Sequence, residues 1–211
     1  MDWQGKLIVF EGLDFTGKST QARLLGETLR QQGYDVMLTR EPGGTIIGER
    51  IREILLSNAT SHLDPLSELL LFMTCRVQLT REVIEPALAT GHVVISSRHR
   101  MSSLAYQGYG RGLDLALIRR LNDAATKQRT SDLLIFLDVG PSDALARRGD
   151  HPDRIEQEEI PFYHRIYDGY KQLLLAEPQA LIVPATEDIE TVARTIRQQI
   201  EAISSTENDR V

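Results

Sequence analysis

Cysteine is almost absent from this 211-residue chain, which contains a single one, Cys75. One thiol cannot form an intrachain disulfide, and it cannot supply the cysteine cluster of a structural zinc site. Disulfide-dense scaffolds and cysteine zinc modules are therefore excluded. The scarcity of cysteine is also typical of proteins from a reducing compartment.

Long apolar runs and an excess of basic residues are missing as well. The longest apolar runs, such as 69–73, are far too short to span a membrane. The first five residues lack the basic and apolar regions of a secretory signal, so we expect a cytoplasmic protein without a membrane partner. The formal net charge is -6, whereas proteins that bind nucleic acid through its phosphates are generally basic. We therefore expect no nucleic-acid partner, while a local basic site for a small phosphate ligand remains compatible with the composition.

The composition, with 41% hydrophobic and 26% charged residues, is that of a globular protein, and the length predicts a single domain over 1–211. Short, continuous apolar runs alternate with helical patterns. This alternation predicts an α/β fold, in which a five-stranded parallel sheet is covered by helices on both faces. The predicted strands are 7–10, 34–38, 93–96, 133–138 and 181–183.

Helical periodicity and turn residues predict the remaining elements. A helix that begins at 141 is expected to run into the charged stretch 147–159. The glycine and proline breaks of this stretch predict a mobile lid at about 141–159. Polar residues at about 204–211 predict a frayed tail. The other predicted helices are 19–32, 47–57, 67–88, 113–127, 161–177 and 189–203.

A glycine-rich segment between the first strand and the first helix fits the phosphate-loop pattern, which is typical of nucleotide-binding three-layer sandwiches. Its backbone N–H groups can surround phosphate oxygens, and the helix N-terminus adds partial positive charge. Lys18 would reach the β- and γ-phosphates of ATP, and the Ser19 hydroxyl would bind Mg²⁺. A plain strand–helix turn is the alternative. The predicted ATP-binding residues are Gly12, Leu13, Asp14, Phe15, Thr16, Gly17, Lys18, Ser19 and Thr20.

Two arginines, Arg40 and Arg98, each follow a predicted strand. Because parallel strands end at the same edge of the sheet, both side chains can point into one crevice there. Arginine suits bidentate contact with phosphate, so both are candidates for holding a phosphorylated acceptor. The alternative for either arginine is a solvated surface position.

Several segments that follow one another in a recognisable order are 10–14, Thr39-Arg40-Glu41-Pro42-Gly43-Gly44-Thr45, Arg98 followed by 102–108, Gly110-Arg111-Gly112, and Asp153-Arg154-Ile155-Glu156. Together they make nearly the whole chain resemble thymidylate kinases. The resemblance implies transfer of the ATP γ-phosphoryl to thymidine monophosphate (dTMP), giving dTDP for dTTP synthesis, with Mg²⁺ as cofactor. It also implies a homodimer, formed through apolar helix faces such as 67–88.

The resemblance also implies roles for individual acceptor-side residues. Phe72 would stack on the thymine ring, and Arg76, four residues later on one helix face, would donate to a base carbonyl. Ser103, Tyr106 and Gln107 would line the base and sugar, with Tyr106 packed where a ribose 2′-hydroxyl would lie. Asp14 would accept from the sugar 3′-hydroxyl or orient an acceptor-side arginine. The alternatives are that Phe72 is a core residue and that Tyr106 and Gln107 belong to a simple turn.

Phosphoryl transfer requires positive charge around the transferred group, and members of this family place an arginine either in the phosphate loop or in the lid. Phe15 and Thr16 are not basic, so this chain resembles the lid-arginine type. Arg148 and Arg154 are the candidates beside Lys18 and Arg98 for the catalytic set, with Arg147 as a further possibility. The alternative is a solvated, charged helix end.

The chain departs from the family pattern at the end of the third strand, where Ser97 replaces the usual Asp. A serine can hold a water near Mg²⁺ but brings no negative charge, so Asp14, Glu11 or Asp138 would have to compensate. Arg100 adds positive charge beside Arg98, at a position where the usual residue of the family is often acidic. Two alternatives follow: a related kinase with another deoxynucleotide acceptor, or a nucleotide-binding homologue with degraded catalysis.

Overall fold

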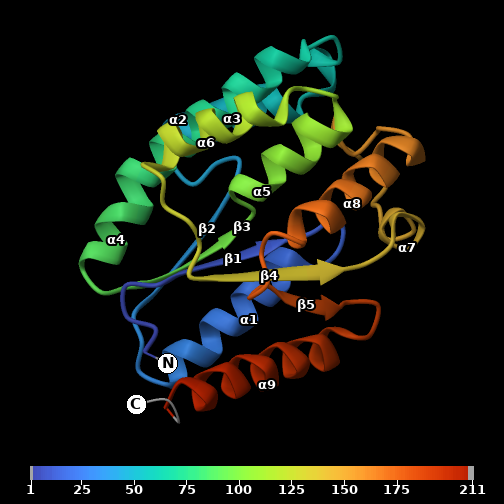
Figure 1. Ribbon diagram of the computed structural model, residues 1–211. Helices are drawn as coiled ribbons and strands as arrows, with labels where there is room; N and C mark the ends of the chain where they lie inside the picture. The colour runs from blue at the N-terminus through green and yellow to red at the C-terminus, as the bar shows by residue number, and fades with distance from the viewer. Residues whose placement is uncertain (1, 209–211) are drawn as a thin grey trace.

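The computed structural model describes residues 2–208 and contains one five-stranded parallel sheet with the order β2-β3-β1-β4-β5 (Figure 1). The predicted fold class is confirmed, and each predicted strand is found within a few residues of its expected position. The strands are β1 (Leu7–Glu11), β2 (Val36–Arg40), β3 (Val93–Ser97), β4 (Leu133–Asp138) and β5 (Leu181–Pro184).

Burial explains why these segments pair as they do. All residues of β1 and β3 are buried, and so are the first five of β4. Strands buried on both faces need continuous apolar sequence, which is the pattern of the central three. The edge strands β2 and β5 are partly exposed, in keeping with their single neighbours.

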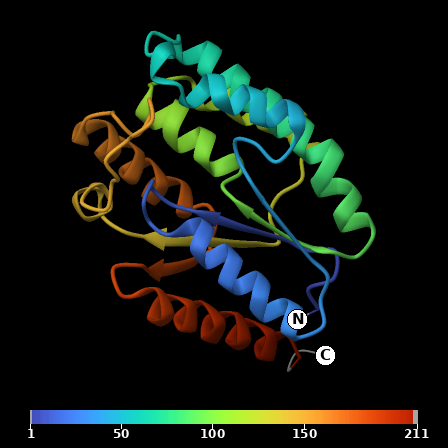
Figure 2. The same cartoon turned by 180° about the vertical axis from the view of Figure 1, so that it is seen from behind.

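Helices cover both faces of the sheet and form the two outer layers (Figures 1 and 2). One face carries α1 and α9, which pack on each other. The other carries α4, the α5–η3 segment and α8, with α2, α3 and α6 beyond them. The bounds are α1 (Lys18–Gln31), α2 (Ile46–Leu56), α3 (Pro65–Leu79), α4 (Glu85–Ala89), α5 (Arg100–Ser103), η3 (Leu104–Gly110), α6 (Leu115–Thr126), α8 (Ile160–Leu174) and α9 (Ile189–Asn208).

Three helical predictions need correction or refinement. The helix predicted over 67–88 is continuous, but a π-helical turn, η2 (Thr80–Ile84), joins α3 to α4. The helix that begins at 141 is only α7 (Pro141–Leu145), because turns follow directly, so its predicted continuation into 147–159 is wrong. The last helix continues past the predicted end at 203 to Asn208, and 209–211 of the predicted tail lie outside the described residues.

The segment that contains Tyr106 and Gln107 is helical, since α5 runs directly into the π-helical η3. The simple turn considered from the sequence is therefore wrong. The chain leaves β3 at Arg98, and α5 and η3 then lead it to α6. Among residues 2–208, no helix is long and apolar enough to cross a membrane.

Candidate active site

The phosphate loop connects the buried strand β1 to α1, as its sequence predicts. Gly12 has φ +140°, and a Cβ at this position would lie 2.8 Å from the carbonyl oxygen of Leu137, so a side chain does not fit. Phe15 has φ 64°, in the left-handed region that non-glycine residues seldom adopt. The loop path is thus held against β4 and carries local strain at Phe15, three residues before α1 begins.

Lys18 lies over the loop with only 7% of its surface exposed. Its Nζ donates to the carbonyl oxygen of Leu13 and lies 3.4 Å from Thr16 Oγ1. Burial, helped by the nearby charge of Arg98, lowers the pKa of Lys18 to about 7. This ammonium group is therefore poorly solvated and is positioned to be stabilised by an incoming anion.

Arg98 follows β3 with a left-handed φ of 73°, which turns its side chain toward the loop. Its Nη1 donates to the Gly12 carbonyl at 3.0 Å, and its Nη2 lies 2.5 Å from Asp14 Oδ1 and 2.9 Å from the Tyr106 hydroxyl. Burial alone would raise the pKa of Asp14, but Arg98 and Lys18 outweigh it and hold this pKa below its usual value. A charged pair therefore lies where the loop and the α5–η3 segment meet.

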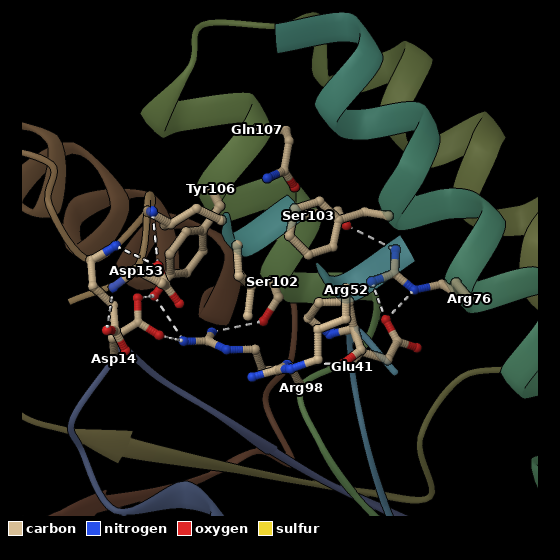
Figure 3. A pocket seen from close by; sticks show the side chains of 15 residues that line it. Asp14, Glu41, Arg52, Arg76, Arg98, Ser102, Ser103, Tyr106, Gln107 and Asp153 are labelled. Carbon is tan, nitrogen blue, oxygen red and sulfur yellow. Dashed lines mark hydrogen bonds and ion pairs between the residues drawn. The ribbon is translucent and has the colours of Figure 1, made fainter. Parts of the chain in front are cut away.

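A pocket opens beside this pair and brings together the acceptor-side residues that the sequence singled out (Figure 3). They come from three separate parts of the chain, namely the phosphate loop, α3 and the β3–α5–η3 segment. Phe72 is half-buried and packs against the core while also lining the pocket, so the core alternative is only partly right. The predicted residues found in this pocket are Asp14, Phe72, Arg76, Arg98, Ser103, Tyr106 and Gln107.

Arg76 lies in the pocket wall but is only 1% exposed. It donates to Glu41 from Nε at 2.8 Å and from Nη2 at 2.5 Å, and its Nη1 donates to Ser103 Oγ at 2.9 Å. Burial would raise the pKa of Glu41, whereas Arg76 and His99 lower it to about 2. Glu41, the partner that fixes this guanidinium, was not predicted from the sequence, although its place directly after Arg40 was a usable signal.

A second pocket lies on the other side of Arg98, next to the phosphate loop. Arg40 and Arg98 both line it, as strand-end placement predicts, and Arg40 also pairs with Glu49 at 3.0 Å. Arg52 of α2 was not predicted, yet it lines both pockets and donates to the Pro42 carbonyl at 2.9 Å. The two pockets share the side chains of Asp14, Glu41, Arg52 and Arg98.

The lid arginines lie in three different surroundings. Arg154 is buried, with Nη2 2.7 Å from Glu68 Oε2 and Nε donating to the Leu55 carbonyl at 2.9 Å. Arg148 is exposed and donates to the Glu156 carbonyl at 3.0 Å. Arg147 donates to the Ala185 carbonyl at 3.1 Å and lines a further pocket beside the phosphate loop. Residues of the segment 185–192 form the other wall of this pocket.

Ser97 is buried at the end of β3 and lines the phosphate-loop pocket together with Ser19. Of the three carboxylates considered as replacements for the missing Asp, Asp14 lines this pocket. Glu11 is fully buried and accepts from the backbone of His99 and Ser102, which ties it to α5.

Asp138 and Arg100 do not line the phosphate-loop pocket and have partners elsewhere. Asp138 accepts from Tyr167 at 2.8 Å and Lys171 at 2.6 Å. Arg100 pairs with Asp123 of α6, so the expectation that it adds charge beside Arg98 is not met. Within the described residues, no three His, Cys, Asp or Glu side chains form a metal-binding group. The Ser19 hydroxyl and the Asp14 carboxylate, which line this pocket together with Lys18, fit Mg²⁺, which proteins bind through few side chains plus water and substrate phosphates.

Comparison with known proteins gives one consistent result. A family model described as thymidylate kinase matches residues 10–196. The chain is 48% identical over 179 residues to a thymidylate kinase of Pelotomaculum thermopropionicum, covering 83% of each chain. It is 44% identical over 201 residues to one from Legionella pneumophila, covering 93% of this chain and 94% of the relative.

A solved structure agrees with these sequence matches. The crystal structure of thymidylate kinase from Ehrlichia chaffeensis superposes with a TM-score of 0.77 at 33% identity, covering 94% of this chain and 99% of that one. The likeness therefore extends over the phosphate loop, both pockets and the lid segment. With the family model matching most of its length, the chain belongs to the thymidylate kinase family.

Proposed function

We propose that this chain phosphorylates dTMP to dTDP by Mg²⁺-dependent transfer of the γ-phosphoryl group of ATP. The observation that carries the proposal is that the phosphate-loop pocket and the acceptor pocket meet at Asp14, Arg52 and Arg98. A donor bound in one and an acceptor bound in the other would bring their phosphates together at this shared wall. No covalent intermediate is required, since positioning and charge neutralisation account for catalysis of this kind.

On the donor side, the loop N–H groups and Lys18 hold the triphosphate, and the Ser19 hydroxyl would hold Mg²⁺. When bound there, the cation would supply positive charge that offsets the charge of the β- and γ-phosphates. The pocket that Arg147 lines with Thr20 and Ile189 extends from the loop and receives the nucleoside of ATP. Ser97 and Asp14 line the same pocket as Ser19, and they would act on the cation through its water ligands.

On the acceptor side, Arg98 and Arg52 bind the 5′-phosphate, with Arg40 at the rim. Phe72 stacks on thymine, and Ser103 and Gln107 contact the base edge. Arg76 has its N–H groups engaged by Glu41, Ser103, Asn122 and His99, so it supports the base site chiefly by holding Ser103. Tyr106 donates to Asp14 at 2.8 Å, and the centre of its ring lies 4.7 Å from the Arg98 guanidinium. The Tyr106 ring thereby fills the sugar side of the pocket.

A coupled assay with ATP, Mg²⁺ and a panel of deoxynucleoside monophosphates tests this function. We expect turnover with dTMP that exceeds turnover with the cytosine and guanine acceptors by at least about a hundredfold, because their base edges mismatch the pocket. Faster turnover of another monophosphate would establish the shifted-acceptor alternative. Binding of ATP and dTMP without any dTDP would establish the degraded homologue and overturn the proposal.

The lid arginines are expected to differ in what their loss affects. Arg148 is exposed, and its hydrogen bond to the Glu156 carbonyl lies within the lid, so it is the candidate that would reach the transferring phosphoryl group. Arg148→Ala should lower kcat by roughly a thousandfold, as loss of an arginine finger does, and leave stability unchanged. Arg154→Ala should instead lower the free energy of unfolding by about 3 kcal/mol, because it leaves the buried Glu68 short of one partner.

Urea denaturation and steady-state rates of both variants provide the comparison. Each variant serves as the control for the other, since both remove one arginine from the same segment. A kcat loss for Arg154→Ala as large as that for Arg148→Ala, without a loss of stability, would contradict this division of roles.

The low pKa of Lys18 predicts proton uptake when the nucleotide binds. At pH 8 most Lys18 is neutral, since its pKa is about 7, and the triphosphate raises this pKa again. Binding of MgATP at pH 8 should therefore take up close to one proton, whereas binding at pH 6 should take up almost none. Calorimetric titration in two buffers of different ionisation enthalpy measures the uptake.

Lys18→Arg is the control, because arginine stays charged at both values and should remove the difference. Equal uptake at pH 6 and pH 8 in the unchanged protein would show that Lys18 is already protonated before the nucleotide arrives.

The protein is proposed to act in the cytoplasm as a homodimer. Support comes from large aliphatic side chains that are exposed along α2 and α3, where an apolar partner surface would cover them. Leu70 of α3 is 48% exposed, and it lies within the segment 67–88 expected from the resemblance. The exposed large aliphatic side chains of these two helices are Ile46, Ile47, Ile54, Leu66 and Leu70.

Leu70→Glu should convert the dimer to a monomer, because it places a charge in the apolar contact. Leu175→Glu is the matched control, since Leu175 is 78% exposed just beyond α8 and away from α2 and α3. Sedimentation velocity reports the mass of each species. A dimer that survives Leu70→Glu, or one that Leu175→Glu breaks, would place the interface elsewhere.

A further inference from the structure

Glu68 of α3 is a buried carboxylate that the reaction itself does not use, with 1% of its surface exposed. Its Oε1 accepts from Gln107 Nε2 at 2.9 Å and from Arg111 Nε at 3.3 Å. Its Oε2 accepts from Arg111 Nη2 at 3.2 Å and lies 2.7 Å from Arg154 Nη2. One carboxylate thus joins α3, η3, the segment after η3 and the lid.

The two arginines fix the position of this carboxylate. Arg111 also pairs with Glu158, and its guanidinium lies 4.6 Å from the centre of the Phe162 ring, so it is held on three sides. Burial would raise the pKa of Glu68, but Arg111, Gln107 and Arg154 outweigh it and lower this pKa. Glu68 is therefore ionised at neutral pH and can only accept hydrogen bonds.

This restriction decides which way the Gln107 amide points. The carbonyl oxygen of an amide cannot donate, so only the NH₂ group of Gln107 can face an ionised carboxylate. The carbonyl oxygen must then lie on the other side of the amide. Figure 3 shows it on the side of the pocket where Ser103 and Arg76 lie. The acceptor pocket thus presents a hydrogen-bond acceptor at Gln107.

Thymine and cytosine differ at the edge that such an acceptor would meet. Thymine carries an N3–H donor, whereas cytosine carries an unprotonated N3 acceptor with an amino group beside it. We propose that Glu68 is a specificity-determining positioning residue, which holds the Gln107 amide in the orientation that accepts from thymine N3–H and repels cytosine N3. This inference rests on the proposed contact of Gln107 with the base.

Glu68→Gln tests the inference, because a neutral amide can pair with either end of the Gln107 amide and removes the bias. The ratio of kcat/KM for dTMP to kcat/KM for dCMP should fall by roughly tenfold, about the effect of one ordinary hydrogen bond. The change should appear mainly in KM. The ratio is measured on one preparation, so it does not depend on the fraction of folded enzyme.

Glu85→Gln is the matched control, since Glu85 pairs with Arg129 away from the pocket, and its ratio should not change. Glu68→Asp is the second variant, to be used if Glu68→Gln does not fold. It keeps the charge for Arg111 and Arg154, but a shorter side chain cannot hold Gln107 as well, so the ratio should again fall. An unchanged ratio in either folded Glu68 variant would overturn the inference.

Gln107→Ala separates this inference from the proposed base site. A raised KM for dTMP in Gln107→Ala, together with unchanged ratios in the Glu68 variants, would refute the role of Glu68 alone. An unchanged KM for dTMP in Gln107→Ala would refute the contact between Gln107 and the base. It would also refute the role of Glu68, which rests on that contact.

Discussion

The contact between Arg98 and Asp14 is the interaction on which the rest of the site depends. Their side chains meet at 2.5 Å where β3 ends beside the phosphate loop, and both line the donor and the acceptor pockets. Removing either charge would leave the other partly buried without its partner, which is costly. The same guanidinium also donates to the loop carbonyl of Gly12, so the acceptor side is fixed relative to the donor loop.

Three buried carboxylates link the elements that surround this ion pair. Glu11 joins the end of β1 to α5, Glu41 holds Arg76, and Glu68 holds Gln107 and the lid arginine Arg154. Each is nearly inaccessible to water, and each is satisfied by donors from distant parts of the chain. Few side chains in the pocket wall can therefore move independently, which suits a reaction that depends on positioning rather than on covalent chemistry.

The different surroundings of the lid arginines could not be predicted from the sequence. Composition correctly indicated a charged, turn-rich segment after α7, but it treated Arg148 and Arg154 as equivalent candidates. Their environments differ because the partners of Arg154, Glu68 and Leu55, lie 86 and 99 residues earlier in the chain. Arg100 shows the same effect, since Asp123 of α6 draws it away from the site. Neither pairing leaves a local signal.

The sequence by itself determined the fold class, the segments of the chain that form the strands, and the identity of the phosphate loop. These features are encoded locally, in apolar runs, in glycine spacing and in residues that follow strand ends. The tertiary structure alone decided which polar side chains come together: Arg52 lines both pockets, Glu41 pairs with Arg76, and Glu68 accepts from Gln107. Hydrogen bonds and ion pairs act over a few ångströms in space, so residues far apart in the chain become partners only after the sheet and its helices have packed.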